Sequence, residues 1–333
     1  MELKEFLAEW HNDNPRILVH TSGSTGKPKP LMVEKRRMLN SARITCDFLR
    51  LKPGDTALLC MPLDYIAGKM MVVRSLQRDL RLTTVRPSSH PLADETLPSF
   101  TFAAMVPMQV YNTLKVPCER ERLMRIRHLI IGGGAISDEL AQMIKPLPNA
   151  VWSTYGMTET LSHIALRRLN GREASEWYTP LPGVGISLNE EDCLVIDAPA
   201  LCATRLVTND RAVLSADGTS RFRILGRKDN IINSGGIKIQ IEEVERLLTP
   251  VMPLPFLITH TPHTQYGEAV TLLYESERAD SEQLSAICTL CSEALPRYWR
   301  PKVYLRVDAL PSTPTGKPAR AEAHALACAL LSS

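Results

Sequence analysis

Short apolar runs alternate with segments of helical periodicity through most of the chain, a pattern typical of an α/β fold. Two sets of positions have the spacing of a buried helix face: Leu3, Phe6, Leu7 and Trp10, and Met38, Ala42, Thr45 and Leu49. Further helices are expected over residues 69–77 and from residue 138 onward, where Ser137 is a good N-cap. The expected strands cover residues 57–60, 128–131 and 151–153.

The pattern changes near residue 193, from where β-structure dominates, with a hairpin expected at Asp217-Gly218. Beyond Gly226 the sequence predicts a helix over residues 241–248 and strands around Phe256 and Val270. A second helix follows, with Asp280 as N-cap and Gln283 completing a capping box, and the last expected strand covers residues 303–307. We therefore expect a large N-terminal α/β domain, residues 1–226, and a small C-terminal α+β domain, residues 227–333.

The composition is that of an ordinary globular protein, with 44% hydrophobic and 23% charged residues. The net charge of +3 is small and both signs are mixed along the chain, so no nucleic-acid partner is expected. No apolar run has the length of a membrane span, and the charged N-terminus does not resemble a signal peptide. The eight cysteines are scattered without the spacing of a disulfide framework. These features predict a cytoplasmic protein without a membrane partner.

The strongest local signal is a run of small hydroxyl and glycine residues that ends in a lysine: Thr21, Ser22, Gly23, Ser24, Thr25, Gly26 and Lys27. Such residues let the backbone approach phosphate oxygens closely and offer amide and hydroxyl donors, while the lysine adds a positive charge. The spacing differs from that of the common nucleotide-triphosphate loop. On composition alone, a flexible polar loop remains an alternative.

Four other segments are ambiguous when each is taken alone. Gly132-Gly133-Gly134 follows a predicted strand and could be a simple turn. The segment Tyr155-Gly156-Met157-Thr158-Glu159-Thr160 offers a ring for stacking on a base and oxygens for a hard cation, but suits a structural turn equally well. The remaining two are Gly226-Arg227-Lys228-Asp229 with Ser234-Gly235-Gly236, and Pro314-Thr315-Gly316-Lys317.

Taken together and in this order, the segments resemble the motifs of the adenylate-forming superfamily, which includes acyl-CoA synthetases, adenylation domains and luciferases. TSGSTGKPK is similar to the phosphate loop of that family, and YGMTET to its adenine and magnesium motif. LGRKDNIINSGG resembles its interdomain hinge motif, and PTGKPAR the C-terminal motif that carries a catalytic lysine. The resemblance extends from about His20 to the end of the chain.

The resemblance implies a role for each residue that matches a motif. Thr21 to Lys27 would hold the β- and γ-phosphates of ATP, and Gly133 and Gly134 would line the adenine and acyl pocket. Within the motif that also contains Gly156 and Met157, Tyr155 would stack on adenine, Thr158 would contact the α-phosphate and Glu159 would bind Mg²⁺. Asp210 would bind the ribose hydroxyls, with Arg227 beside it.

The C-terminal motifs would serve the two half-reactions. Lys317 would contact the α-phosphate and the carboxylate during adenylation, together with Thr158 and Glu159. Asp229 occupies the hinge position, and Ser234, Gly235 and Gly236 would line the tunnel for the pantetheine arm of coenzyme A. The resemblance thus implies ATP, Mg²⁺ and coenzyme A as cofactor and cosubstrates, and a small carboxylic acid as substrate.

Two departures from the family pattern concern the N-terminal half. The phosphate loop usually lies far into the chain, but here it starts at Thr21, so an acyl-CoA synthetase-like fold with a reduced N-terminal subdomain is expected. In the motif matched by residues 62–68, Tyr65 stands where the family often has histidine. The aromatic character is kept and any imidazole role is lost.

The short N-terminus and the stretch YGMTETLSHIAL are most similar to the o-succinylbenzoate–CoA ligases of menaquinone synthesis. Because that acid has a second carboxylate, a cation or several donors should line its pocket, and the candidates are Lys69, Arg74, His163 and Arg167. Three alternatives are a ligase for another aryl or fatty acid, an enzyme that loads a carrier-protein thiol, and a non-catalytic nucleotide-binding module. A homo-oligomer is possible, and the sequence leaves the oligomeric state open.

Overall fold

The computed structural model of the chain describes residues 1–20, 30–134, 136–277, 280–312 and 318–332. It contains two compact units, one made of Met1–Leu188, Val195–Val207 and Leu214–Arg223, and the other of Asn189–Leu194, Thr208–Val213 and Ile224–Ser333. The chain passes between the units within strands β11 (Cys193–Asp197), β12 (Leu206–Leu214) and β13 (Phe222–Arg227). The domain boundary at residue 226 and the mobility of the C-terminal domain stay predictions.

The first unit is built on a seven-stranded sheet. Its order is β4 (Arg81–Thr84), β3 (Thr56–Leu59), β5 (Phe102–Met105), β6 (His128–Ile131), β7 (Ala150–Gly156), β8 (His163–Arg168) and β9 (Thr179–Pro180). The strands from β4 to β7 are parallel to one another, and β8 and β9 pair antiparallel. All four residues of β5 are buried, as expected for a parallel strand covered on both faces.

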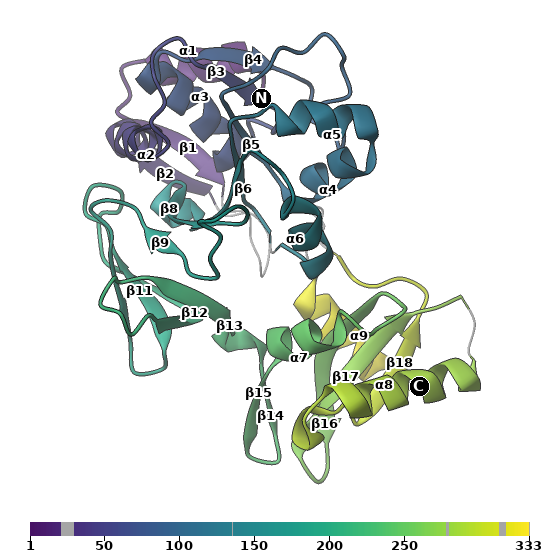
Figure 1. Ribbon diagram of the computed structural model, residues 1–333. Coiled ribbons are helices and arrows are strands. Elements are labelled where there is room, and N and C mark those ends of the chain that lie inside the picture. Colours follow the sequence, from purple (N-terminus) through teal and green to yellow (C-terminus); the bar gives the residue numbers. More distant parts are fainter. Residues whose placement is uncertain (21–29, 135, 278–279, 313–317, 333) are drawn as a thin grey trace. The chain divides into compact units, whose positions relative to one another are not determined.

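The described residues of the first unit form the helices α1 (Leu3–His11), α2 (Lys35–Phe48), α3 (Ile66–Arg78), α4 (Pro107–Lys115), α5 (Pro117–Met124) and α6 (Asp138–Ile144). The apolar stripe of α2 is buried as predicted, and Phe6 and Trp10 bury one face of α1. The N-cap prediction is confirmed, because Ser137 Oγ accepts a hydrogen bond from the Leu140 amide at 3.2 Å. Helices α4, α5 and α6 lie together beside β5 and β6 (Figure 1).

Two smaller sets of strands complete this part of the chain. The antiparallel pair β1 (Arg16–His20) and β2 (Pro30–Glu34) flanks residues 21–29. A four-stranded sheet has the order β10 (Gly185–Leu188), β11, β12 and β13. The neighbouring strands β12 and β13 confirm the hairpin predicted at Asp217-Gly218.

The second unit has a sheet in the order β15 (Ile237–Gln240), β14 (Ile231–Ser234), β17 (Gly267–Glu275) and β16 (Phe256–His263), with β18 (Val303–Val307) parallel to β17. Its helices are α7 (Ile241–Leu248), α8 (Ser281–Ala294) and α9 (Arg320–Ser332), with a short 3₁₀ turn at Arg297–Trp299. Ile232, Val244, Ile258, Leu272 and Ile287 are fully buried between sheet and helices. This arrangement matches the predicted α+β pattern.

Two features of the second unit differ from the sequence prediction. Helix α9 was not predicted, because its alanine-rich sequence has little apolar periodicity. The predicted capping box of α8 was wrong in part. Asp280 caps the helix by accepting from the Glu282 amide at 2.9 Å, but the Gln283 side chain accepts from Ser276 Oγ at 2.9 Å instead of returning to the cap. Within the described ranges, the longest apolar helical stretches are too short or too polar to cross a membrane.

Candidate active site

The segment predicted to bind phosphates, Thr21 to Lys27, lies outside the described residues. The strands on either side of it pair directly, with His20 opposite Pro30. Lys69 on α3 is buried and donates from Nζ to the Leu18 carbonyl oxygen on β1 at 2.7 Å. The helix therefore holds the strand that leads into the predicted loop.

The glycine segment 132–134 leaves the carboxyl end of β6 in close contact with β7. The Gly132 amide donates to the Met105 carbonyl at 3.1 Å, and a Cβ atom on Gly132 would lie 2.5 Å from Thr154 Oγ1. A side chain at position 132 would therefore clash with the Thr154 side chain on β7. In parallel sheets, ligands bind at this carboxyl edge. The roles of Gly133 and Gly134 in a nucleotide pocket stay predictions.

The turn after β7 is tightly packed. A Cβ atom on Gly156 would lie 2.3 Å from the Ser162 carbonyl oxygen, so the turn requires glycine. The Met157 amide donates to Thr160 Oγ1 at 2.9 Å, and the same hydroxyl lies 2.7 Å from the Ser162 carbonyl oxygen. These contacts fix the short 3₁₀ turn Thr158–Thr160, in which Thr158 and Thr160 are buried and Glu159 is exposed.

Tyr155, near the end of β7, and Glu159, in the turn that follows, are the two residues of this motif with predicted roles toward adenine and Mg²⁺. The Tyr155 ring contacts the rings of Tyr178 and Phe222, with centroids 5.9 and 5.2 Å away. The exposed Glu159 carboxylate sits on a rigid turn, an arrangement that could hold a hard cation. Neither the stacking of Tyr155 on adenine nor the binding of Mg²⁺ by Glu159 is tested by these contacts, and both stay predictions.

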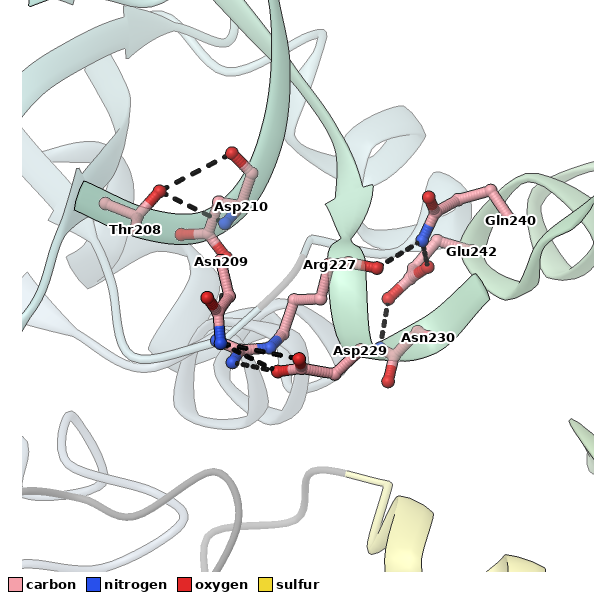
Figure 2. Close-up of polar contacts among 8 residues, drawn as sticks. All are labelled: Thr208, Asn209, Asp210, Arg227, Asp229, Asn230, Gln240 and Glu242. Atoms are coloured by element: carbon pink, nitrogen blue, oxygen red, sulfur yellow. Dashed lines mark hydrogen bonds and ion pairs between the residues drawn. The ribbon is translucent and has the colours of Figure 1, made fainter. Parts of the chain in front are cut away.

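In the second unit, Asp210, Arg227 and Asp229 form one charged group (Figure 2). Arg227 donates from Nη2 to Asp229 Oδ2 at 2.7 Å, and its Nη1 lies 3.6 Å from Asp210 Oδ1. Asn209 Nδ2 donates to the Asp229 carboxylate at 3.1 Å. Burial alone would lower the pKa of Arg227, but the bond to Asp229 and the charge of Asp210 outweigh it and raise the pKa. The structure thus brings the predicted ribose and hinge residues together within this unit.

A second set of contacts fixes the strand end that carries Arg227. Gln240 Nε2 donates to the Arg227 carbonyl oxygen at 2.8 Å and to Glu242 Oε2 at 2.6 Å (Figure 2). Asn230 also donates to Glu242. Asp229 therefore lies in a short 3₁₀ turn, Lys228–Asn230, between two anchored residues.

Gly235 and Gly236 form the two-residue turn of the β14–β15 hairpin, with φ angles of +58° and +83°. Positive φ at both central positions is the geometry that favours glycine in tight hairpins. The Gly235 amide donates to the Tyr266 carbonyl at 2.8 Å, and Ser234 is buried. The predicted tunnel-lining role of Ser234, Gly235 and Gly236 stays a prediction.

Lys317 lies outside the described residues, but the chain on both sides of its motif is fixed. Ser312 pairs with Pro318 as an isolated bridge, and the Ala319 amide donates to the Pro311 carbonyl at 3.0 Å. Three residues after Lys317, Arg320 makes two 2.6 Å bonds to the Glu245 carboxylate on α7. A two-bond arginine–carboxylate pair of this kind gives a fixed orientation.

Arg74 on α3 is buried, with 2% of its surface exposed. Its Nη2 donates to Ser162 Oγ at 2.5 Å, and no ion pair among the described residues includes it. Burial lowers the pKa of the Arg74 guanidinium to about 10, so it remains protonated at neutral pH. A buried cation without a carboxylate partner is costly, and such a group is a candidate for binding an anion.

His163 is buried beside Arg74. Its Nε2 lies 3.1 Å from Thr45 Oγ1 and its Nδ1 lies 3.3 Å from Ser162 Oγ. Burial, reinforced by the charge of Arg74, holds the pKa of His163 well below its usual range, so the ring is neutral. Arg74 is therefore the charged member of this group.

The four predicted substrate-binding candidates thus have different surroundings. Lys69 bonds to the backbone of β1, and Arg167 stacks over Tyr178 with 5.2 Å between its Cζ and the ring centroid. Arg74 and His163 share a network with Ser162 and Thr45. Sequence reasoning missed the last two, although Ser162 directly precedes His163 and could have been considered with it.

A model of the family described as AMP-binding enzyme matches residues 3–203. The chain belongs to this family. The resemblance inferred from its motifs is thereby confirmed, as is the acyl-CoA synthetase-like α/β fold. The family match ends before Asp210, so the C-terminal candidates rest on their own motifs.

The chain is also similar to proteins of known structure. An acyl-CoA synthetase (AMP-forming)/AMP-acid ligase II-like protein from Dyadobacter fermentans has 33% identity and a TM-score of 0.65, with 96% of this chain and 91% of that one covered. The o-succinylbenzoate coenzyme A synthetase from Bacillus subtilis, solved with ATP and magnesium, shares the fold at 22% identity and a TM-score of 0.74, over 92% and 69% of the two chains.

Among curated proteins, the 2-succinylbenzoate–CoA ligase of Lactococcus lactis is 26% identical over 337 residues, which are 95% of this chain and 72% of that ligase. Three further ligases of the same name are matched over only 56%, 53% and 54% of their length. The chain therefore spans about half to three quarters of these relatives.

The surroundings of Asp229 allow a test of the predicted hinge. Proline fixes φ, so Asp229→Pro should spare one half-reaction of this AMP-binding enzyme and block the other. Asp229→Ala is the matched control, because it removes the same bonds to Arg227 and Asn209 without fixing the backbone. Pyrophosphate exchange and thioester formation from supplied acyl-adenylate would be measured separately. Equal effects of proline and alanine on both half-reactions would show that Asp229 is not the hinge.

Proposed function

We propose that this AMP-binding enzyme activates 2-succinylbenzoate with ATP to an acyl-adenylate and transfers the acyl group to coenzyme A. The names of the Lactococcus lactis and Bacillus subtilis proteins support this acid as the substrate. We further propose that the reaction takes place in the cytoplasm.

The observation that carries the choice of acid is the buried charge of Arg74, which makes no ion pair with any residue that the structure describes. In 2-succinylbenzoate one carboxylate reacts and the other keeps its charge. Moving this second carboxylate from water into a partly dry pocket is costly unless it pairs with a cation. The guanidinium of Arg74 could be that cation. Ser162 connects Arg74 to the turn after β7, which contains the predicted adenine motif. A monocarboxylic acid would leave Arg74 without a counter-ion.

The proposed chemistry assigns a task to each motif. The acid's reacting carboxylate attacks the α-phosphorus of ATP, the bond to the bridging oxygen breaks and pyrophosphate leaves. Lys317 would stabilise the negative charge that develops on the α-phosphate oxygens. Thr158 would orient that phosphate, while Asp210, held by Arg227, would bind the ribose hydroxyls. Mg²⁺ held by Glu159 would add charge neutralisation at the phosphates.

The second half-reaction has different requirements. The sulfur of coenzyme A attacks the acyl carbon, the bond to AMP breaks, and the thiol proton goes to the solvent or to a released phosphate oxygen. The Gly235-Gly236 turn exposes backbone without side chains, which suits the passage of a narrow pantetheine arm. We propose that the C-terminal domain, residues 227–333, turns about Asp229 between the two half-reactions.

A panel of acids tests this proposal. The purified protein would receive ATP, Mg²⁺ and coenzyme A with 2-succinylbenzoate, benzoate or a medium-chain fatty acid, and AMP and thioester would be measured. We expect 2-succinylbenzoate to give the highest kcat/KM. A higher kcat/KM with the fatty acid would refute 2-succinylbenzoate as the substrate. Pyrophosphate exchange without any thioester would refute coenzyme A as acceptor and favour a carrier-protein thiol. No exchange with any acid would favour a non-catalytic nucleotide-binding module.

A further inference from the structure

A cavity in the first unit lies at the amino ends of strands β6 and β7, whereas the glycine and tyrosine motifs lie at their carboxyl ends. It has a volume of about 360 Å³, within the range of small-molecule sites. His128 at the start of β6 and Trp152 near the start of β7 line it, whereas Gly132 and Gly156 follow the other ends of these strands. Four residues of extended chain, about 13 Å, separate Trp152 from Gly156. The cavity is therefore separate from the candidate active site.

The charges around this cavity are mostly positive. Arg50, Arg127 and Arg168 line it, and Glu173 is its acidic residue. No ion pair among the described residues includes any of these arginines. Burial, together with the charges of Arg127 and Arg168, lowers the pKa of His128 to about 4. Three guanidinium ions with a single carboxylate among them leave an excess of positive charge, which favours an anion with more than one negative charge.

One arginine of the cavity is held in place by the sheet. Arg168 on β8 lies directly opposite Trp152 on β7, and its Cζ is 5.0 Å from the centre of the indole ring. Its Nε donates to the carbonyl and side-chain oxygens of Asn170, both at 3.0 Å. These contacts fix the guanidinium plane and leave its terminal amino groups for a ligand. An oriented guanidinium loses little entropy on binding an oxyanion.

One wall of the cavity is apolar. Trp152 Nε1 and His128 Nδ1 are shielded from solvent, so these two atoms do not face the cavity. Phe48, whose ring meets Trp152 edge-on at 5.3 Å, and Leu49 give the cavity an apolar wall.

We propose that this cavity is a binding site for a small phosphate monoester with an apolar part. A phosphate monoester has nearly two negative charges at neutral pH and three acceptor oxygens. These match the excess of two arginines over acidic residues and the forked donors that the arginines present. The wall formed by Phe48 and Leu49 would contact the apolar part. This proposal does not depend on the reaction proposed for the site at the carboxyl ends of the strands.

The indole groups of the chain's four tryptophans allow a site-specific test. Each gives one N–H signal in a ¹H–¹⁵N spectrum of the full chain, and Trp152→Phe identifies the signal of Trp152. Titration with phenyl phosphate should move this signal saturably at millimolar concentration or below, while phenol should not move it. Inorganic phosphate should bind more weakly, because it lacks the apolar part. Equal shifts with phenol, or no shift at all, would overturn the proposal.

Exposed arginines of the cavity provide variants that should fold. The double variant Arg50→Gln, Arg127→Gln removes two charges, and its affinity for phenyl phosphate should fall about tenfold or more. Arg43→Gln removes an equally exposed arginine from α2, outside the cavity, and should bind as the unchanged protein does. The other three indole signals report whether each variant is folded. Unchanged affinity in the double variant would assign the binding elsewhere and refute the site.

Discussion

Replacing Arg74 with methionine is expected to raise the KM for 2-succinylbenzoate by roughly ten- to a hundredfold. The estimate corresponds to the loss of one charge-assisted hydrogen bond to the second carboxylate. The kcat/KM for benzoate should change little, because benzoate has no group to pair with the guanidinium. Steady-state kinetics with both acids, measured through AMP release, would give the two values.

The same variant should not be destabilised. Arg74 is buried and has no carboxylate partner in the described ranges, and replacing such a charge with an apolar side chain of similar length is often neutral or stabilising. Urea unfolding would show whether the midpoint stays or rises. Arg78→Met, one turn further along α3, is the matched control, because Arg78 pairs with Asp47. A similar loss with both acids would mean that Arg74 supports packing and does not recognise the substrate.

Adenylation by the Lys317→Ala variant should be slower by roughly a hundredfold or more. This magnitude is typical when a group that stabilises transition-state charge is removed. Formation of thioester from supplied acyl-adenylate should be largely kept, because the charge on the α-phosphate develops in the first half-reaction. Pyrophosphate exchange and single-turnover thioester formation would be measured on the same preparation.

Lys145→Ala serves as the control for this variant, because Lys145 is exposed at the end of α6, away from every predicted motif. Its exchange rate should equal that of the unchanged protein. The anchored neighbours of the lysine motif, Pro318 to Arg320, should keep the variant folded. Unchanged exchange in Lys317→Ala would remove this residue from the adenylation step.

Much of the fold follows from local patterns in the sequence. The stripe from Met38 to Leu49 and the run His128–Ile131 predicted α2 and β6, because their burial depends on spacing along one element. Ser137 was recognisable as a cap for the same reason, since its bond reaches only three residues ahead. Helix α9 could not be found in this way, because an alanine-rich helix gives almost no apolar stripe.

The candidate site could be predicted only in part. The motifs identified Asp210, Arg227 and Asp229, but the bonds that join them come from two strands and a turn that meet only after folding. The contact of Thr45 with His163 joins residues 118 positions apart, and that of Ser162 with Arg74 joins residues 88 positions apart. A single sequence does not indicate such long-range contacts. A tight turn is different, because a glycine such as Gly156 marks it in the sequence.

If Arg74 binds the second carboxylate as proposed, its guanidinium would also disfavour acids that lack such a group. A fatty acid chain placed against it would strip water from a charge and return no bond, so binding would be penalised before any chemistry began. A cell contains many such acids, and their adenylates would consume ATP without product. Arg74 makes no ion pair within the part of the chain that the structure describes, which is costly for the folded protein alone, but this arrangement would reduce the activation of unsuitable acids in a mixture of metabolites.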